Sequence, residues 1–163
     1  MWQPCGCHTP EFSDDKYEWT GIVNVTVGFV VPVPVRWSDI DMYQHLNHAT
    51  TVTIMEEARV PFLRPAFELD VATIGLVVAE VRVAYKGQLR LPDSPLQVTM
   101  WVKQLRTVDF TIGYEIRSVH AAPDARPAVI AETQLAAFDI EEQRLVRLQP
   151  HHREYLQSWL RDD

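Results

Sequence analysis

The chain contains one helical segment followed by a succession of strand-like segments, and this order limits the folds open to it. Between about residues 47 and 68, apolar side chains recur at the three- and four-residue spacing of a helix face. After Gly75 come four segments of strand character, at residues 76–90, 95–105, 108–119 and 127–140. A run of strands after a single helix favours an antiparallel sheet over repeated βαβ units. We therefore predict one amphipathic helix packed against one strongly curved sheet.

The limits of these elements carry signals of their own. Asn47 is the predicted N-cap of the helix, and Pro61 is expected to kink it or to end its first part. A further strand is predicted between about residues 22 and 37, and a short helix at about residues 151–160. One face of the main helix is predicted to consist of Val52, Met55, Glu56, Arg59, Phe62 and Leu63.

Length and composition indicate one soluble domain. The chain has 163 residues, of which 47% are apolar, and a net charge of −7. We interpret residues 1–20 as a flexible tail and residues 21–163 as the domain. The sequence has no block of Lys and Arg, which argues against a nucleic-acid partner. Its longest apolar stretch, residues 27–35, is about half a membrane span, and the start resembles no signal peptide, so we expect a cytoplasmic protein without membrane association.

The segment from residue 36 to residue 59 holds the residues most suited to catalysis. Asp39 and Asp41 lie two positions apart and face the same side of an extended chain, and His45, Asn47 and His48 follow closely. The loop then enters a helix N-terminus, where free N–H groups can stabilise a negative oxygen. A carboxylate that attacks or activates water, next to oriented N–H donors, suits hydrolysis of a thioester or ester.

The same segment resembles the hot-dog-fold thioesterases of the 4-hydroxybenzoyl-CoA thioesterase family. The residues that carry the resemblance are Arg36, Trp37, Asp39, Asp41, His45, Leu46 and Asn47, followed by Glu56, Glu57, Ala58 and Arg59. Two positions depart from the family pattern: Gln44 stands where a glycine is usual, and His48 replaces a second asparagine. One branch of the family carries histidine at the latter position as a candidate catalytic partner.

The resemblance, which extends over residues 28–150, implies a fold and an activity. The fold is α+β, a hot-dog fold with one long central helix wrapped by a curved antiparallel sheet of five or six strands. The activity is hydrolysis of an acyl-CoA thioester to free acid and CoA in lipid metabolism, with neither metal nor cofactor. The expected partners are the acyl-CoA and further copies of the chain, in a homodimer or homotetramer with the active site at a subunit interface.

The resemblance also implies roles for individual residues. Asp41 is the expected nucleophile or general base, assisted by His48, with Asn47 at the helix start. A backbone N–H near His48 or Ala49 is expected to polarise the thioester carbonyl. One of Glu56 and Glu57 is a second-choice nucleophile, since a helix glutamate is the catalytic carboxylate in another hot-dog lineage. The expected substrate-binding residues are Asp39, His45, Ala49 and Glu57 around the loop, and Lys86 and Arg90 for the phosphates of CoA.

Three alternatives stay open on sequence grounds. Asp39, Asp41, His45 and His48 are residue types that bind zinc, but their crowding on one loop argues against four converging ligands. Hot-dog folds also include hydratases and dehydratases, whose D-x-N-P-x-H and H-F-P patterns do not occur in this sequence. The remaining alternative is a non-enzymatic module that binds acyl-CoA in the same site.

Overall fold

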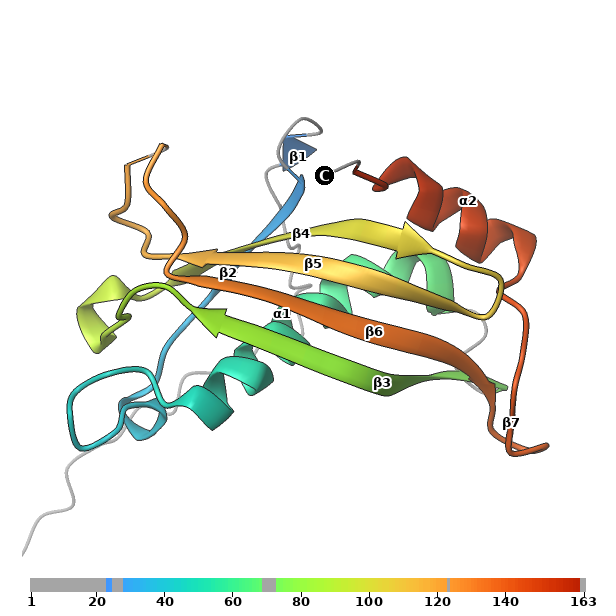
Figure 1. The fold of residues 1–163 in the computed structure, drawn as a ribbon, viewed down its shortest axis with the longest axis horizontal. Coiled ribbons are helices and arrows are strands. Elements are labelled where there is room, and N and C mark those ends of the chain that lie inside the picture. Colours follow the sequence, from blue (N-terminus) through green and yellow to red (C-terminus); the bar gives the residue numbers. More distant parts are fainter. Residues whose placement is uncertain (1–22, 25–27, 69–72, 123, 162–163) are drawn as a thin grey trace, which may run out of the picture.

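The computed structural model describes residues 23–24, 28–68, 73–122 and 124–161, and their fold is a single curved sheet with one long helix across it (Figure 1). The sheet has seven strands in the order β1-β2-β4-β5-β6-β3, with β7 paired to β6, and every pairing is antiparallel. The strands are β1 (Val23–Asn24), β2 (Gly28–Val33), β3 (Ile74–Tyr85), β4 (Leu96–Leu105), β5 (Asp109–Arg117), β6 (Val129–Asp139) and β7 (Arg144–Leu145).

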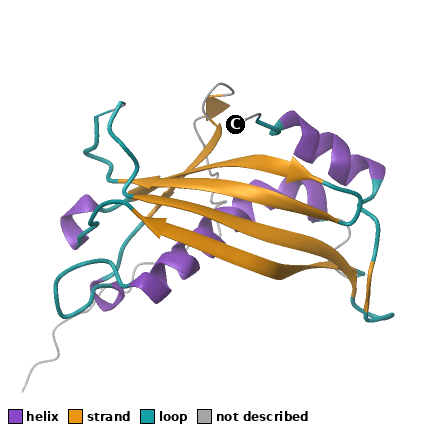
Figure 2. Cartoon of the chain, in the orientation of Figure 1, coloured by secondary structure: helices purple, strands orange, loops and turns teal. Residues whose placement is uncertain are grey.

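The long helix α1 (His48–Phe67) crosses one face of the sheet (Figure 2). Its N-cap is Asn47, as predicted, and it continues through Pro61 and Pro65 without ending. Because proline lacks an N–H, each of these residues leaves the carbonyl four positions earlier without its helical donor. A second helix, α2 (Pro150–Ser158), contacts α1 and β4, and two short 3-10 helices, η1 (Trp37–Asp39) and η2 (Leu91–Asp93), complete the fold. The expected α+β architecture is confirmed.

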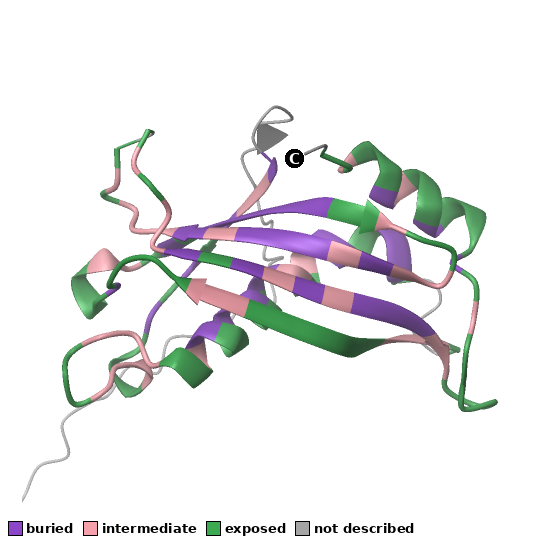
Figure 3. Ribbon diagram, in the orientation of Figure 1, coloured by how far each residue is buried: buried purple, intermediate pink, exposed green. Residues whose placement is uncertain are grey.

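The core lies between α1 and the central strands. Alternate residues of β5 point toward the helix, and Phe110, Ile112, Tyr114 and Ile116 are fully buried. Phe62 of α1 is also fully buried, and its ring centroid lies 5.3 Å from that of Phe29. Figure 3 shows this burial along β4, β5 and β6, whereas β3 at the sheet edge is exposed over most of its length. Among the described residues, no helix is long and apolar enough to cross a membrane.

The buried face of α1 differs from the predicted one. Val52 and Glu56 are exposed, whereas Thr51 and Ile54 are buried. The Thr51 hydroxyl donates a hydrogen bond to the carbonyl of Asn47, which allows this polar side chain to be buried at low cost. The predicted tail at residues 1–20 lies outside the described residues.

Candidate active site

The candidate residues gather where several chain segments meet at one end of the sheet. In an antiparallel sheet each strand ends where its neighbour begins. The end of β3 and the end of β5 therefore both lie beside the start of β6. The start of α1, the loop before it, η2 and the loop after β5 all lie at this end (Figure 1, left). Residues from three separate parts of the sequence are thus brought to the same end of the sheet.

The loop between η1 and α1 is closed by its own backbone. The N–H of Asp41 donates to the carbonyl of His45 at 2.8 Å, and the N–H of Asn47 donates to the carbonyl of Asp39 at 2.9 Å. Ile40 and Leu46 form an antiparallel bridge between these two bonds. The loop therefore returns to its starting point and then leads directly into α1.

The carboxylate of Asp41 stabilises this loop through one of its two oxygens. Oδ1 accepts hydrogen bonds from the N–H groups of Tyr43 at 2.8 Å and His45 at 3.1 Å. Its other oxygen, Oδ2, makes no hydrogen bond to any residue that the structure describes. Gln44 sits at the tip with φ of 63°, a left-handed conformation that glycine adopts most easily. The glycine usual at this position in the resembling family would fit the same backbone.

The first turn of α1, which follows the loop directly, presents backbone donors of its own. The side chain of Asn47 accepts a hydrogen bond from the N–H of Ala49 at 2.8 Å, which occupies that donor. The N–H groups of His48 and Thr50 make no hydrogen bond to another part of the described chain. Within the first turn, the donors that a ligand oxygen finds open are therefore those of His48 and Thr50. Thr50 was absent from the sequence prediction, because the N-cap geometry that occupies Ala49 decides which amides stay open.

Two other predicted residues have structural contacts. Asp39 accepts a hydrogen bond from the N–H of Arg36 through Oδ2 at 2.6 Å and so caps η1. Glu57 lies 3.9 Å from the guanidinium of Arg36, with both side chains largely exposed. Such a surface ion pair contributes roughly 0–1 kcal/mol.

A small hollow of about 150 Å³ lies directly beside the loop. His45 and Thr51 contribute to its wall from the motif, and Tyr85 contributes from the end of β3. The Tyr85 hydroxyl donates to the carbonyl of His48 at 3.0 Å, so it also helps to hold the helix start. The remaining lining residues are Leu46, Gly87, Gln88, Leu89 and Val129. Tyr85 was not predicted from the sequence, since its position depends on the pairing of β3 with β6.

The two predicted phosphate-binding residues lie on the segment after β3. Lys86 is exposed and lines a second hollow of about 270 Å³. Arg90 is also exposed, and its guanidinium donates to the side-chain oxygen of Gln88 at 3.3 Å. The structure thus brings Lys86 into a concave site, whereas Arg90 lies outside the lining of that hollow.

An apolar pocket of about 350 Å³ lies between the second half of α1 and the beginning of β3. Its lining residues are Arg59, Val60, Leu63, Arg64, Phe67, Glu68, Ile74, Gly75 and Leu76. Met55 and Phe62 of the predicted helix face do not line this pocket and are fully buried in the core. The phenol of Tyr114 is buried near Arg59, and this burial raises the pKa of Tyr114, while the positive charge of Arg59 acts in the opposite direction.

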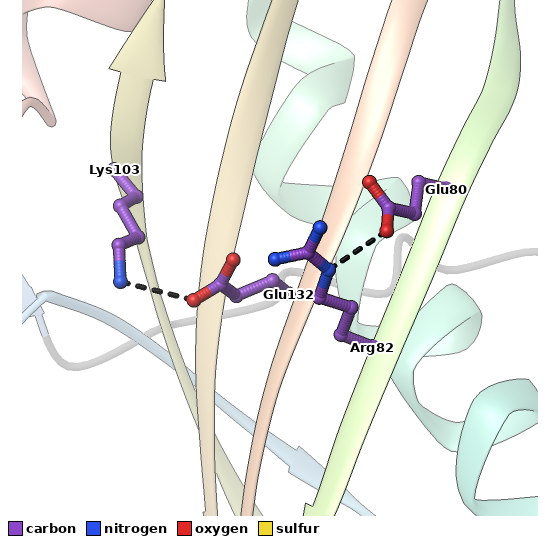
Figure 4. Close-up of polar contacts among 4 residues, drawn as sticks. All are labelled: Glu80, Arg82, Lys103 and Glu132. Carbon is purple, nitrogen blue, oxygen red and sulfur yellow. Dashed lines mark hydrogen bonds and ion pairs between the residues drawn. The ribbon is translucent and has the colours of Figure 1, made fainter.

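The opposite face of the sheet carries paired charges. Arg82 lies 2.7 Å from Glu80, and Lys103 lies 2.9 Å from Glu132, on the side turned away from α1 (Figure 4). Glu80, Arg82 and Glu132 border a polar hollow of about 170 Å³, and Lys103 borders a neighbouring hollow of about 210 Å³ that shares Glu132. No group of three or more His, Cys, Asp or Glu residues is arranged to hold a metal ion within the described ranges.

Comparisons with known proteins agree with this architecture. A probable thioesterase of Escherichia coli, YbaW, is 25% identical with a TM-score of 0.69, covering 81% of this chain and 98% of that chain. Slr0204 of Synechocystis, a 1,4-dihydroxy-2-naphthoyl-CoA thioesterase, is 15% identical with a TM-score of 0.66, covering 79% and 95%. A thioesterase of Thermus thermophilus solved with coenzyme A and Zn is 22% identical with a TM-score of 0.65, covering 80% and 92%.

These solved structures share the hot-dog arrangement predicted for this chain. A search of curated proteins finds no match. The family model described as the thioesterase-like superfamily matches residues 35–160, a range that includes the motif loop, α1, the sheet from β3 to β7 and α2. The chain therefore belongs to the thioesterase-like superfamily.

Proposed function

We propose that the chain hydrolyses an acyl-CoA thioester to a free acid and CoA, with Asp41 as the reacting carboxylate. The observation that carries the proposal is the arrangement of Asp41: Oδ1 is bound within the loop, Oδ2 is left open, and the α1 N-terminus follows directly. Membership of the superfamily supports thioester hydrolysis in general. One solved neighbour contains coenzyme A and another is named for an aromatic acyl-CoA, which supports this carrier.

The chemistry follows from these positions. The thioester carbonyl oxygen accepts hydrogen bonds from the N–H groups of His48 and Thr50, where the helix dipole favours negative charge. Oδ2 of Asp41 either attacks the carbonyl carbon, giving a mixed anhydride, or takes a proton from the attacking water. In both cases the C–S bond breaks and CoA leaves as a thiolate. The exposed His48 assists by passing to solvent the proton that the attacking water releases.

The acyl group is assigned to the apolar pocket between α1 and β3. The pocket has apolar walls from Val60, Leu63 and Phe67, and its volume of about 350 Å³ suits a small ligand. Its first lining residue, Arg59, lies roughly 15 Å along the helix axis from Ala49, at about 1.5 Å per residue. An acyl chain that reaches from the motif loop into the pocket must therefore be long.

Self-association is part of the proposal. The strand β3 has twelve residues and is the end strand of the sheet, so its outer edge carries backbone groups available for pairing. Val77, Val78 and Val81 are exposed along it. A second copy paired at this edge would cover these valines and lie beside the acyl pocket, which supports a homodimer with its site near the interface.

The test is thiol release from a panel of short, long and aromatic acyl-CoA thioesters. Asp41→Asn retains Oδ1 as an acceptor for the loop but removes the carboxylate, and we expect its kcat to fall at least about a hundredfold. Asp93→Asn is the matched control, because Asp93 Oδ2 accepts the N–H of Arg90 at 2.7 Å in a similar cap away from the motif loop. Hydrolysis by Asp41→Asn at the wild-type rate would refute the proposed role of Asp41.

The alternative function is binding without hydrolysis. Wild-type protein that binds acyl-CoA but releases no thiol across the whole panel would favour this binding module. Single-turnover hydrolysis in heavy-oxygen water distinguishes the two roles of Asp41. Direct attack, followed by hydrolysis of the anhydride at the aspartyl carbon, leaves the heavy oxygen in the aspartate, whereas a general base directs it into the acid product.

A further inference from the structure

The apolar pocket of about 350 Å³ between α1 and β3 has an uneven charge. Its charged lining residues are Arg59, Arg64 and Glu68. Arg64 and Glu68 form an ion pair at 2.9 Å, and both side chains are more than half exposed, so their charges offset each other in solvent. The charge that remains is that of Arg59. This apolar pocket therefore has one excess positive charge, although the whole chain has a net charge of −7.

Arg59 is weakly compensated for a cation that is largely buried. Its side chain is 12% exposed, whereas that of its ion-pair partner Glu56 is 66% exposed. The hydrogen bond between them joins Nη2 of Arg59 to Oε1 of Glu56 at 3.4 Å, which is long for such a contact. A guanidinium has five N–H donors, and burying them is costly unless they find acceptors. Because no other hydrogen bond joins this guanidinium to the described part of the chain, Arg59 retains donors for a further acceptor.

Two buried hydroxyl groups near Arg59 have unused hydrogen-bonding capacity. Thr133 of β6 lies opposite Ile112, two residues from Tyr114 on β5, so the two side chains share the face of the sheet that packs on α1. Both residues are buried, and neither hydroxyl has a hydrogen-bond partner among the described residues. The positive charge of Arg59 opposes the rise that burial causes in the pKa of Tyr114, which indicates that the guanidinium lies close to the phenol. Since buried hydroxyls normally have a partner, this cluster is an unusual feature of the core.

We infer that Arg59 binds a carboxylate at the far end of the acyl group, and that the substrates include thioesters of dicarboxylic acids. A carboxylate offers acceptors alone, and a guanidinium binds its two oxygens through parallel N–H donors. The exposed Glu56 can turn into solvent or share the guanidinium with the ligand. Tyr114 and Thr133 are buried in the core, where their oxygens can accept N–H donors that the ligand leaves unused.

The position of Arg59 along the helix determines the length of the ligand. The inference rests on the proposed function, which puts the thioester carbonyl at the first turn of α1 and the acyl group in this pocket. Arg59 lies roughly 15 Å along the helix axis from Ala49, at about 1.5 Å per residue. A carboxylate that reaches Arg59 is therefore separated from the thioester by a long apolar chain, for which Val60 and Leu63 supply apolar walls.

The first test uses pairs of CoA thioesters with equal numbers of carbon atoms, one ending in a carboxylate and one in a methyl group, over a range of chain lengths. The readout is the carboxyl preference, which is kcat/KM for the first divided by kcat/KM for the second. We expect this preference to be highest at one chain length in the wild type. At that length it should fall at least about tenfold in Arg59→Met, because a charge-assisted contact is lost. Arg64→Met is the matched control, since Arg64 lines the same pocket but is paired with Glu68 in solvent, and it should keep the wild-type preference.

A second variant acts in the opposite direction. A purely structural role of Arg59 would lower kcat/KM for both members of a pair alike, and such an equal loss in Arg59→Met would overturn the inference. Glu56→Gln removes an exposed side-chain charge that is not part of the pocket lining. We expect it to raise the carboxyl preference, since Arg59 loses its competing partner. A preference that stays the same or falls in Glu56→Gln would also contradict the inference.

Calorimetric binding separates this inference from the proposed function. The same pairs of thioesters are titrated into Asp41→Asn, with and without Arg59→Met, so that hydrolysis does not interfere. We expect the affinity for the carboxyl-ended thioester, relative to the methyl-ended one, to fall at least about tenfold when Arg59 is replaced. If the wild type hydrolyses neither substrate, the proposed function fails, but these titrations still test the inference. Equal relative affinities in the two proteins would overturn the inference and leave hydrolysis by Asp41 unaffected.

Discussion

Trp101 lies directly opposite Gly113 on the neighbouring strand, and its indole occupies the space that a Cβ on Gly113 would need. A Cβ built there would meet the ring carbons Cε2 and Cζ2 at 2.6 and 2.7 Å. On the same ring, the guanidinium of Arg161 lies 4.8 Å from the centroid. The glycine thus allows a large aromatic side chain to lie flat on the outer face of the sheet and to be covered there by the chain end after α2.

Gly113→Ala should therefore destabilise the protein. We expect the free energy of unfolding to fall by about 1–3 kcal/mol, the usual cost of overpacking a filled site. Urea denaturation of wild type, Gly113→Ala, Trp101→Ala and the double variant measures this. In the Trp101→Ala background the glycine substitution should cost much less, because the clashing ring is gone. The same cost in both backgrounds would show that the ring is not the cause.

Gln44→Gly should stabilise the motif loop. Gln44 has φ of 63°, a backbone conformation that costs residues with a Cβ about 1–2 kcal/mol. Glycine removes this cost in the folded state, but its greater freedom in the unfolded chain offsets part of the gain in stability. A net increase of about 0.5–1 kcal/mol in the free energy of unfolding is expected by urea denaturation. Gln143→Gly, at φ of 51° in the turn before β7, is the comparison and should gain less, because it also removes the hydrogen bond that the Gln143 side chain donates to the carbonyl of Ile140 at 2.7 Å. A loss of stability in Gln44→Gly would mean that the glutamine side chain itself supports the loop.

Tyr155 should make stability depend on pH in the alkaline range. Its hydroxyl donates to the carbonyl of Phe62 at 2.5 Å, and burial raises its pKa from 10.0 to about 12. Since the folded state favours the neutral phenol, this contribution is complete below pH 10 and is lost as pH rises from 10 to about 12. Tyr155→Phe should lower stability by about 1 kcal/mol at neutral pH and flatten the decline above pH 10.

Thermal unfolding of wild type and Tyr155→Phe at a series of pH values checks this. Tyr43→Phe is the control, since Tyr43 is 71% exposed. An equally steep alkaline decline in wild type and Tyr155→Phe would assign the pH dependence to other groups.

Val60→Trp should shorten the acyl chains that the enzyme accepts. Val60 is 61% exposed and lines the apolar pocket, so a larger side chain there takes up pocket volume with little effect on the core. We expect kcat/KM for long acyl-CoA substrates to fall by about tenfold or more, with short substrates unaffected. Thiol release on both kinds of substrate measures it, the short substrate serving as the internal control. An equal fall in kcat/KM for the long and the short substrates would show that the substitution disturbs the fold and not the pocket alone.

Val78→Lys should weaken self-association at the β3 edge. Val78 is 50% exposed, and a lysine on an edge strand opposes pairing with another strand. Sedimentation velocity should show a larger share of monomer for this variant than for wild type at equal concentration. Ile130→Lys is the control, because Ile130 is similarly exposed but belongs to β6, which is paired on both sides. Identical sedimentation of all three proteins would contradict association through β3.

The sequence was sufficient for the order of elements and for the helix start, because both depend on local signals. Asn47 caps α1 as predicted, and the predicted strands after Gly75 correspond to β3, β4, β5 and β6. The buried face of α1 was predicted less well, since Thr51 enters the core only after its hydroxyl binds the chain itself. The thioesterase-like superfamily is confirmed, while the narrower 4-hydroxybenzoyl-CoA thioesterase family stays a prediction.

The parts of the candidate site that come from distant segments could not be read from one stretch of chain. Tyr85 reaches the helix start only because β3 pairs with β6 in one particular register. Arg126 lines the same hollow as Lys86 for the same reason, although the two residues are forty positions apart in the sequence, roughly the length of a hairpin of two long strands and its connections. Periodicity and motif spacing do not predict contacts between residues that are distant in the sequence, because these contacts depend on strand pairing.

If Asp41 reacts as proposed, its two tasks restrict how this loop can change through descent. One oxygen holds the turn and the other would react with the thioester, so the two tasks cannot be assigned to different side chains by small steps. Asparagine is the single exchange that preserves the first task while ending the second, since its amide oxygen still accepts both backbone N–H groups. A relative that had given up hydrolysis but still held its ligand would therefore be expected to carry asparagine here, and alanine only where the loop itself had been rebuilt.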